Sequence, residues 1–137
     1  MERLKGKTAF ISGGARGLGA EMARLLHGEG ANVMVTDILE DEGHALANDH
    51  ENMTFMAHDV LQEDHWAATI AATKEAYGGL DILVNNAGIA HNATIIEETS
   101  YEQWRKVVGI DLDAVFLGCK HGVGLMKESG AGSIINI

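Results

Sequence analysis

The stretch Ser12-Gly13-Gly14-Ala15-Arg16-Gly17-Leu18-Gly19 decides the fold of this chain. It follows an apolar run at 8–11 that predicts a buried strand, and it opens a segment with the spacing of an amphipathic helix. Glycines allow the backbone to turn sharply there and to approach a ligand closely. A strand, a glycine-rich turn and a helix in this order predict that the helix N-terminus holds a pyrophosphate. A plain tight turn is the alternative.

Apolar runs alternate with helical segments along the rest of the chain. The helix after the turn is expected to pack through its apolar residues Leu18, Met22, Leu25 and Leu26. Strands are predicted at 8–11, 32–36, 54–57, 80–84 and 133–137, and helices at 18–28, 40–48, 62–77 and 101–127. This alternation predicts a Rossmann-type, doubly wound α/β fold, in which a parallel sheet of five strands lies between two layers of helices.

Size and charge narrow the classes of function. The chain has 137 residues, of which 46% are hydrophobic, enough for one packed domain over 1–137. Its formal net charge is −10, from 20 acidic and 10 basic residues, and it lacks a cluster of lysine and arginine. This argues against a nucleic acid or an anionic membrane surface as a partner.

Cysteine and histidine usage bears on compartment and metals. Cys119 is the single cysteine, which excludes an internal disulfide and favours a reducing compartment. The apolar run at 8–11 is too short for a signal peptide, and no segment is long enough to span a bilayer, so a cytoplasmic protein is expected. The seven histidines show none of the spacings typical of metal ligands, and no metal is expected.

Asp37 closes the second predicted strand, about 20 residues beyond the glycine turn. A carboxylate at that place can accept both hydroxyls of an adenosine ribose, and it repels a 2′-phosphate. Arg16 favours the opposite choice, because a guanidinium could contact that phosphate. Ile38 and Leu39 follow Asp37, so no basic residue stands beside it, and NAD is favoured over NADP. An aspartate that only begins a turn is the alternative.

Further motifs make the chain similar to a known family. Asp59-Val60 follows the third predicted strand, and Asn85-Asn86-Ala87-Gly88 follows the fourth. With the glycine turn and Asp37, they resemble the classical short-chain dehydrogenase/reductase family over residues 4–137. The sequence of the turn is similar to that of the bacterial NAD-dependent hydroxysteroid and secondary-alcohol dehydrogenases in particular.

The resemblance implies a role for each of these positions. Arg16 and Leu18 would line the pyrophosphate, Asp37 would bind the adenosine ribose, and Asp59 and Val60 would hold the adenine. The last motif would run beneath the cofactor. The implied cofactor-binding residues are Ser12, Gly13, Arg16, Gly17, Leu18, Gly19, Asp37, Asp59, Val60, Asn86, Ala87 and Gly88. The alternatives are a solvated turn carboxylate at position 59 and a strand-end amide at position 86.

The resemblance also implies an activity and an assembly. The expected reaction is hydride transfer between NAD and a small alcohol or ketone, carried out by a dimer or tetramer. Segment 89–94 is the part of the chain expected to contribute to the substrate pocket. On the long predicted helix, Trp104, Val108, Val115 and Phe116 are expected to pack in the core, with a subunit contact as the alternative. Cys119 on the same helix is expected in the core rather than as a nucleophile.

Asp111 departs from the family pattern. It falls in the same apolar stripe as Trp104, Val108 and Val115, where an unpaired carboxylate costs several kcal/mol. The family typically has an asparagine at this place, which helps to position the water chain behind its catalytic lysine. Asp111 is therefore the one candidate for a catalytic role, and an aspartate tolerated at a helix kink is the alternative.

The family's other catalytic groups do not occur in this sequence. The resemblance implies a serine directly after the fifth strand and a later Tyr-x-x-x-Lys, whose tyrosine moves the hydroxyl proton. Tyr77 and Tyr101 are instead followed, four residues later, by Asp81 and Arg105. The chain also has no proline, where about 5% is usual, and it is expected to be the N-terminal part of a longer domain. An oxidoreductase and a truncated, non-catalytic NAD-binding product both remain open.

Overall fold

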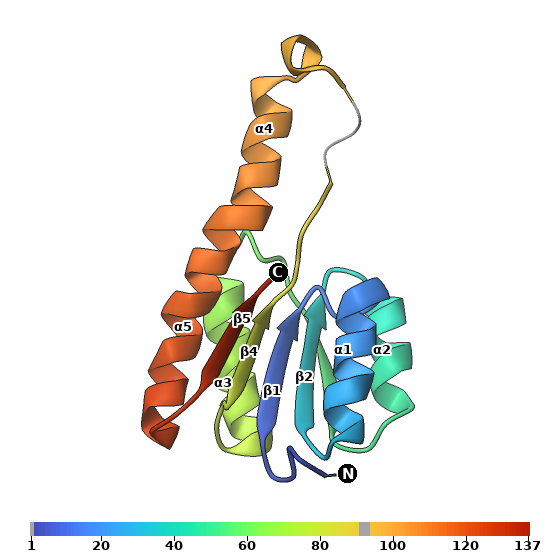
Figure 1. Cartoon of the computed structure of the whole chain (residues 1–137), viewed down its shortest axis with the longest axis vertical. Coiled ribbons are helices and arrows are strands. Elements are labelled where there is room, and N and C mark those ends of the chain that lie inside the picture. The colour runs from blue at the N-terminus through green and yellow to red at the C-terminus, as the bar shows by residue number, and fades with distance from the viewer. Residues whose placement is uncertain (1, 91–93) are drawn as a thin grey trace.

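The computed structural model describes residues 2–90 and 94–137, which form one five-stranded sheet (Figure 1). The strands are β1 (Thr8–Ser12), β2 (Asn32–Asp37), β3 (Met53–Ala57), β4 (Ile82–Asn85) and β5 (Ser133–Asn136). Their order in the sheet is β3-β2-β1-β4-β5, and every neighbouring pair is parallel. The predicted doubly wound α/β fold is therefore confirmed.

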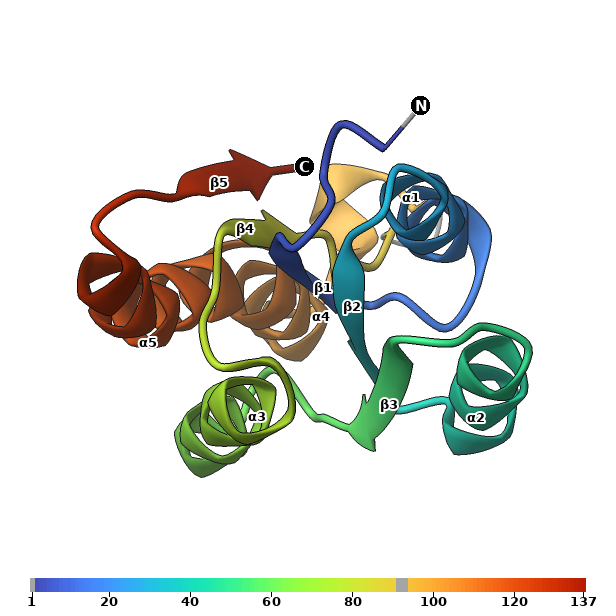
Figure 2. The ribbon, with the colours of Figure 1, turned by 90° about the horizontal axis from the view of Figure 1, so that it is seen from below.

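Helices cover both faces of the sheet. They are α1 (Gly17–Gly28), α2 (Glu40–Asn48), α3 (Glu63–Tyr77), η1 (Ile96–Glu98, a 3-10 turn), α4 (Tyr101–Val108), η2 (Gly109–Asp113, π-helical) and α5 (Ala114–Ser129). Helices α1 and α2 lie on one face, and α3 and α5 lie on the other (Figure 2). In the described ranges, no helix combines the length and apolar content that a membrane crossing requires.

The sheet separates two hydrophobic clusters. Successive strand residues point to opposite faces, so the fully buried neighbours Phe10 and Ile11 of β1 belong to different clusters. Ile11 packs on the side of α1 and α2, where Phe55 and Leu46 also lie. Phe10 packs on the side of α3 and α5 against Trp66, whose ring centroid lies 5.8 Å from its own. Such two-sided burial is what a parallel sheet requires.

Helix α1 contacts the sheet through small residues, contrary to the predicted leucine stripe. Ala20 and Ala23 are buried against the sheet, whereas Leu18 and Leu25 are 60% and 69% exposed. Met22 and Leu26 are half-buried at the border of the cluster. Small side chains let the helix axis lie close to β1 and β2, and this closeness leaves no room for leucines between helix and sheet.

The long predicted helix is interrupted by η2, whose wider turn changes the direction in which the following side chains point. Helix α4 and η2, called the arm below, project beyond the sheet in Figure 1. Trp104 of α4 and Phe116 of α5 were expected in the core, but they are 54% and 64% exposed. Helix α5 buries Ala114, Gly118, Gly122, Leu125 and Met126 instead. The expected core position was therefore wrong for Trp104 and Phe116, whereas Val108 and Val115 of the same stripe are half-buried.

Candidate cofactor site

A cleft of about 360 Å³ opens where the strands end on their carboxyl side. Doubly wound folds bind ligands at this edge, where the order of the strands reverses between β1 and β4. Eleven of the twelve predicted cofactor residues line the cleft: Gly13, Arg16, Gly17, Leu18, Gly19, Asp37, Asp59, Val60, Asn86, Ala87 and Gly88. The structure thus brings together residues that the sequence spreads over four strand ends.

The glycine turn packs against the strand ends without room for side chains. A Cβ at Gly19 would lie 2.2 Å from the carbonyl oxygen of Gly13, and one at Gly13 would lie 2.7 Å from the Cα of Ala87. Gly17 has φ +55°, a backbone conformation that residues with a Cβ rarely adopt. Gly17 is the first residue of α1, and a Cβ added there would have no other atom within 4 Å.

The N-terminus of α1 faces the cleft without a capping side chain. Arg16 is the N-cap, it makes no side-chain cap hydrogen bond, and the first turn contains no acidic residue. The free N–H groups of this turn and the helix dipole therefore favour an anionic ligand group. The side chain of Arg16 is exposed and adds positive charge at the same place. The arrangement suits a pyrophosphate.

Ser12 does not line the cleft, and its hydroxyl holds the floor of the cleft in place. The hydroxyl oxygen accepts the backbone N–H groups of Asn86 (3.1 Å) and Ala87 (3.2 Å). Asn86 returns two bonds, because its Nδ2 donates to the carbonyl oxygens of Ser12 (3.1 Å) and Gly13 (2.9 Å). The residue pair thus ties the end of β4 to the turn after β1. Side-chain amides and hydroxyls commonly satisfy backbone groups at strand ends in this way.

Asn85, the last residue of β4, connects this strand to β5 and to α5. This side chain is buried, and its Nδ2 donates to Oδ1 of Asn136 in β5 (2.8 Å) and to Sγ of Cys119 in α5 (3.6 Å). A Cβ at Gly118 would lie 2.1 Å from Asn85 Oδ1, so α5 approaches the strand closely at that glycine. Cys119 is half-buried, and its contact with Asn85 is structural.

Asp37 uses both carboxylate oxygens to order the edge of the cleft. Its Oδ2 accepts the backbone N–H of Ala15 and its Oδ1 accepts that of Leu39, each at 3.1 Å. The side chain thereby holds the glycine turn and the start of α2 in a defined relation to β2. Each carboxylate oxygen still has acceptor capacity for a ribose hydroxyl, since an ionised carboxylate offers about four lone-pair sites.

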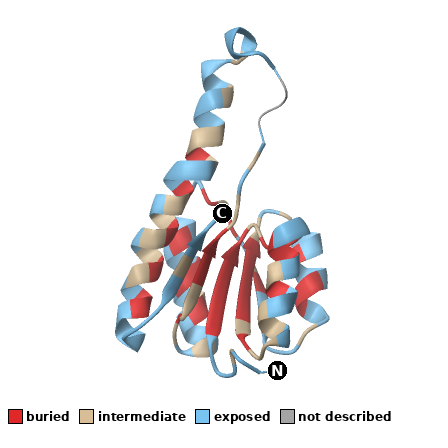
Figure 3. Cartoon of the chain, viewed as in Figure 1, coloured by how far each residue is buried: buried red, intermediate tan, exposed pale blue. Residues whose placement is uncertain are grey.

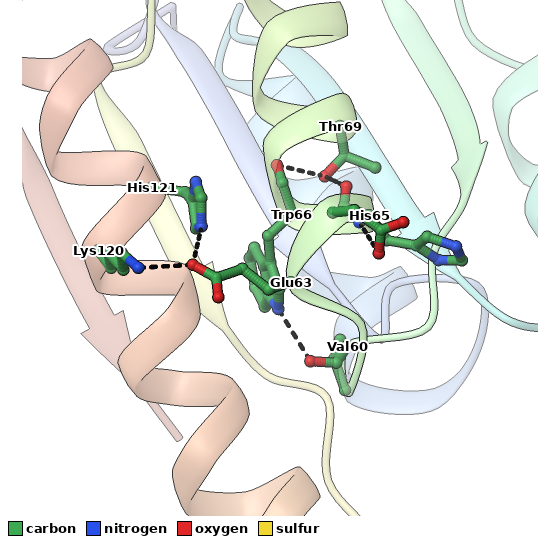
Figure 4. A network of polar contacts seen from close by, with 8 residues as sticks. Val60, Glu63, His65, Trp66, Thr69, Lys120 and His121 are labelled. Atoms are coloured by element: carbon green, nitrogen blue, oxygen red, sulfur yellow. Dashed lines mark hydrogen bonds and ion pairs between the residues drawn. The ribbon is translucent and has the colours of Figure 1, made fainter.

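The loop between β3 and α3 is held by side chains of the helix that follows it (Figure 4). Trp66 is buried, and its Nε1 donates to the carbonyl oxygen of Val60 (2.9 Å). The backbone N–H of Asp59 donates to Nδ1 of His65 (3.1 Å). Glu63 is the first residue of α3, and its side chain contacts α5. Its Oε1 accepts hydrogen bonds from Lys120 Nζ (2.6 Å) and from His121 Nε2 (3.1 Å), and these contacts lower the pKa of the Glu63 carboxyl.

His58 joins the ends of β2 and β3 beneath the cleft. The side chain is 2% exposed, its Nδ1 lies 2.9 Å from Thr36 Oγ1, and its Nε2 has no hydrogen-bond partner. Burial lowers the pKa of His58 from 6.5 to about 4, with a smaller contribution from nearby His65. The imidazole ring is therefore neutral at ordinary pH, and it packs edge-on against Trp66 at 4.4 Å between centroids.

Asp111 lies in η2 and is exposed, so the expected cost of a buried carboxylate does not arise. Its Oδ1 accepts the backbone N–H of Ile89 (3.0 Å) and lies above Gly88, whose added Cβ would be 3.4 Å away. The expectation that Asp111 lies in a buried apolar stripe with Trp104 was wrong, because both side chains are exposed. The alternative, an aspartate tolerated at a helix kink, concerns the place where the structure has the π-helical turn η2.

Five further residues line the cleft: Ile89, which belongs to the expected substrate segment, and Ile38, Leu39, His58 and Ile110, which the sequence did not indicate as site residues. Each lies within two residues of a predicted site residue, and that closeness in sequence is the one signal that could have found them. Of the expected substrate segment 89–94, residues 91–93 lie outside the described residues. No group of three or more potential metal-binding side chains gathers anywhere in 2–90 or 94–137.

Comparison with known proteins supports one family throughout. The short chain dehydrogenase family matches residues 7–137. The chain is 46% identical to the 3-alpha-(or 20-beta)-hydroxysteroid dehydrogenase of Mycobacterium tuberculosis, over 98% of this chain and 52% of that protein. It is 43% identical to trans-4-hydroxycyclohexanecarboxylate dehydrogenase of Sinomonas cyclohexanicum, over 99% of this chain and 56% of the relative. It is also 43% identical to the 3-beta-hydroxysteroid dehydrogenase of Comamonas testosteroni, over 98% and 53%.

These matches cover the sheet, the helices and the cleft, and the chain spans about half the length of the curated relatives it matches. The resemblance inferred from the glycine turn and the motif after β4 is thereby confirmed, including its similarity to hydroxysteroid dehydrogenases. The chain belongs to the short-chain dehydrogenase family.

Proposed function

We propose that the chain binds NAD in the cleft and forms the cofactor-holding part of an NAD-dependent dehydrogenase that interconverts an alcohol and a ketone. The observation that carries the proposal is the joint presence, in one cleft, of an uncapped helix N-terminus, a glycine turn and Asp37. The bound nicotinamide would supply the hydride chemistry, and the residues described here hold and orient it.

Each part of the cleft fits one part of the cofactor. The first turn of α1 with Arg16 and Leu18 would bind the pyrophosphate, because it offers free N–H groups and no side chain at Gly17. Asp37 would accept the hydroxyls of the adenosine ribose, and Asp59 with Val60 would hold the adenine. The segment from Asn86 to Gly88, anchored on Ser12, would support the cofactor from below.

Asp37 supports NAD rather than NADP as the cofactor. Its carboxylate is held rigidly by Ala15 and Leu39, so it cannot turn away from a 2′-phosphate without losing two hydrogen bonds. Two like charges in contact disfavour binding. Arg16 could favour the phosphate, but it lies at the glycine turn, and Ile38 stands directly beyond Asp37.

The relatives support a cyclic secondary alcohol or ketone as the substrate class. Three of them are named for hydroxyl groups on steroids or a cyclohexane ring. Ile89 and Ile110 are among the residues that line the cleft, and apolar lining of this kind suits a hydrocarbon ring. Asp111 stands where the family typically has asparagine. Its Oδ1 would hold Ile89 in position by accepting the backbone N–H of that residue.

A non-catalytic NAD-binding protein is the second candidate. The positions of the two tyrosines of the chain, Tyr77 and Tyr101, favour it. Tyr77 lies in α3 with its hydroxyl bonded to Thr54, and Tyr101 is 76% exposed at the start of α4. Neither residue lines the cleft, so neither can transfer a proton to a substrate there.

The exposed side chains of the arm support an assembly of like subunits. Trp104 and Leu112 of the arm, and Phe116 at the start of α5, are each more than half exposed, and exposed apolar surface of this kind commonly marks a protein contact. We propose that the arm packs against its copy in a homo-oligomer. Sedimentation of the wild-type chain and of Trp104→Asp is expected to show a dimer or larger species that the substitution weakens.

Titration with NADH tests the cofactor proposal directly. Purified chain is expected to enhance nicotinamide fluorescence with saturation, and Asp37→Ala is expected to reduce the preference for NADH over NADPH at least tenfold, about 1.4 kcal/mol. Asp49→Ala, which removes an exposed carboxylate outside the cleft, is the matched control and is expected to behave as wild type. The absence of a saturable signal, or a preference for NADPH in the wild type, would overturn the proposal.

A further inference from the structure

The loop that would hold the adenine rests on the buried side chain of His58. This residue directly precedes Asp59 and Val60, and it is 2% exposed. Its ring packs edge-on against Trp66, at 4.4 Å between centroids, and against Phe10, at 6.2 Å. Close packing of this kind restricts the imidazole to one orientation, so each of its nitrogens has defined surroundings.

A chain of buried hydrogen bonds leads from this ring to β1. His58 Nδ1 lies 2.9 Å from Thr36 Oγ1, and the Thr36 hydroxyl donates in turn to the carbonyl oxygen of Ile11 (3.4 Å). Thr36 is fully buried, and its own carbonyl oxygen accepts the backbone N–H of Gly14 (3.0 Å). The loop after β3 is thereby joined to β2, and through β2 to the glycine turn that would bind the pyrophosphate.

The directions of these bonds define which nitrogen of His58 carries its proton. A hydroxyl has one proton, and Thr36 gives it to Ile11, so His58 Nδ1 must donate to Thr36 Oγ1. Nε2 is then the unprotonated nitrogen, and it has no hydrogen-bond partner among the described residues. Buried acceptors without a partner are less rare than buried N–H groups without one, which favours the same tautomer. Burial lowers the pKa of His58 to about 4, so the ring is neutral near neutral pH.

The backbone on both sides of Asp59 is held by the same buried groups. The N–H of His58 donates to the carbonyl oxygen of Asp37 (2.9 Å), and the carbonyl oxygen of Val60 accepts Nε1 of Trp66 (2.9 Å, Figure 4). Trp66 is 1% exposed and contacts the His58 ring. Asp59 itself is half-buried, so its place at the cleft depends on its two anchored neighbours.

We infer that His58, protonated on Nδ1 and bonded to Thr36, is a positioning residue that makes the cleft selective for adenine, because it holds Asp59 where its carboxylate can accept the amino group of that base. The inference rests on the proposed function, since it concerns the same cleft. Adenine carries a donor amino group where hypoxanthine has an oxygen, and a carboxylate attracts the first and repels the second. Loss of the bond between His58 and Thr36 is therefore expected to weaken discrimination between the two bases.

Calorimetry on the purified chain at neutral pH, with ADP-ribose and with IDP-ribose, in which hypoxanthine replaces adenine, tests the inference. The wild type is expected to bind ADP-ribose about tenfold more tightly than IDP-ribose. His58→Leu fills the site of the ring with an apolar side chain that cannot donate to Thr36, so this preference is expected to fall below about threefold. His58→Asn places an amide donor near the position of Nδ1 and is expected to retain most of the preference.

Further variants separate positioning from general loss of structure. Thr36→Val removes the partner hydroxyl and is expected to lower the preference as His58→Leu does. The double variant is expected to lose no more than either single variant, because both changes remove the same bond. Leu125→Ala, in the same hydrophobic cluster but on α5 and outside the cleft, is the matched control. It is expected to lose stability and to keep the wild-type preference.

Nitrogen NMR of the imidazole ring tests the tautomer. The His58 signals are identified by their absence from the spectrum of His58→Asn. In the wild type, the proton is expected on Nδ1, and the Nε2 signal is expected in the range of an unprotonated nitrogen. A proton on Nε2 would mean that the Thr36 hydroxyl donates to His58 and not to Ile11, which would overturn the inference as drawn.

The binding outcomes distinguish the inference from the proposed function. A His58→Leu variant that keeps the wild-type preference, a wild type that binds both probes equally, or a Leu125→Ala variant that also loses the preference overturns the inference and leaves nucleotide binding in the cleft intact. A wild-type chain that binds neither probe overturns both. A preference that is lost in His58→Leu and Thr36→Val and retained in His58→Asn and Leu125→Ala supports both.

Discussion

The sheet with its cleft and the arm use the same kinds of side chain in opposite surroundings. Trp66 on α3 is 1% exposed, contacts Phe10 and His58, and donates its Nε1 hydrogen to Val60. Trp104 on the arm is 54% exposed. Figure 3 shows the difference as buried strands beside an arm whose surface is mostly exposed.

Apolar residues at helical spacing therefore indicate that one face of a helix can be buried, but they do not indicate which element, if any, packs against that face. Helix α4 begins with a well-formed capping box, in which the Ser100 hydroxyl and the Gln103 side chain bind each other's backbone N–H groups. Local signals thus suffice to start this helix without a core beside it. The sheet region, by contrast, depends on contacts between segments that are distant in sequence.

The two tryptophans allow the largest test of this contrast. Trp66→Ala opens a cavity in the core and removes the bond to Val60, so the free energy of unfolding is expected to fall by about 3–5 kcal/mol. Trp104→Ala is its matched control, with an expected loss below about 1 kcal/mol at a concentration where the chain is monomeric. Urea unfolding followed by circular dichroism measures both values. Similar losses in the two variants would contradict the difference in burial.

A methyl group at Gly19 tests the close packing around the cleft. Gly19→Ala places a Cβ 2.2 Å from a backbone oxygen, so the turn must move, and a loss of about 3 kcal/mol together with loss of NADH binding is expected. Gly28→Ala, on the same helix with no atom within 4 Å of the added Cβ, is expected to leave binding unchanged and stability equal or slightly higher. Normal binding by Gly19→Ala would show that the turn is not constrained as described.

Mild acid is expected to destabilise the sheet region through His58. An unfolded histidine binds its proton near pH 6.5, whereas the pKa of the buried ring is about 4. Between these values the unfolded state binds more protons, so the free energy of unfolding falls as the pH decreases, by about 3 kcal/mol at most from this group. His58→Asn is expected to be less stable at pH 7 and to show a shallower decrease. Equal slopes for both proteins in urea unfolding from pH 7 to 4.5 would refute this.

The smallest expected effect concerns the junction between the arm and the cleft. Asp111→Asn retains an oxygen for the N–H of Ile89 and is expected to change stability by less than about 0.5 kcal/mol, whereas Asp111→Ala is expected to cost about 1 kcal/mol. Amide hydrogen exchange at Ile89 should accelerate only in the alanine variant. Asp113→Ala, which removes only an exposed ion pair with Arg105, is the control and should leave that exchange rate unchanged.

Much of the cofactor site could be predicted because it is encoded locally. The strand, the glycine turn and the helix are contiguous, and Asp37, Asp59 and Asn86 each follow directly after a strand. Parallel strands bring such positions to one edge of the sheet, so the sequence positions alone predict their proximity. Ser12 was the exception, since its place at a strand end did not reveal that its hydroxyl binds the chain after β4 and not the cleft.

The remaining features depend on distant contacts that periodicity cannot supply. The small-residue face of α1 follows from how close the helix lies to the sheet, which leaves Leu18 and Leu25 outside. The environment of Asp111 follows from the π-helical turn, because one extra residue per turn rotates the side chains that follow. The neutral state of His58 follows from burial beneath Thr36 and Trp66, which the sequence does not indicate.

The sequence by itself determined the family, the doubly wound topology and eleven of the sixteen residues that line the cleft, because these depend on motifs and on strand ends. Only the tertiary structure decided which apolar faces are covered, which polar side chains hold the backbone, and that His58 is buried as a neutral ring. The physical reason is that burial and hydrogen-bond partners are properties of segments brought together by folding. A local pattern sets what a segment can form, and its neighbours in space set the environment of each side chain.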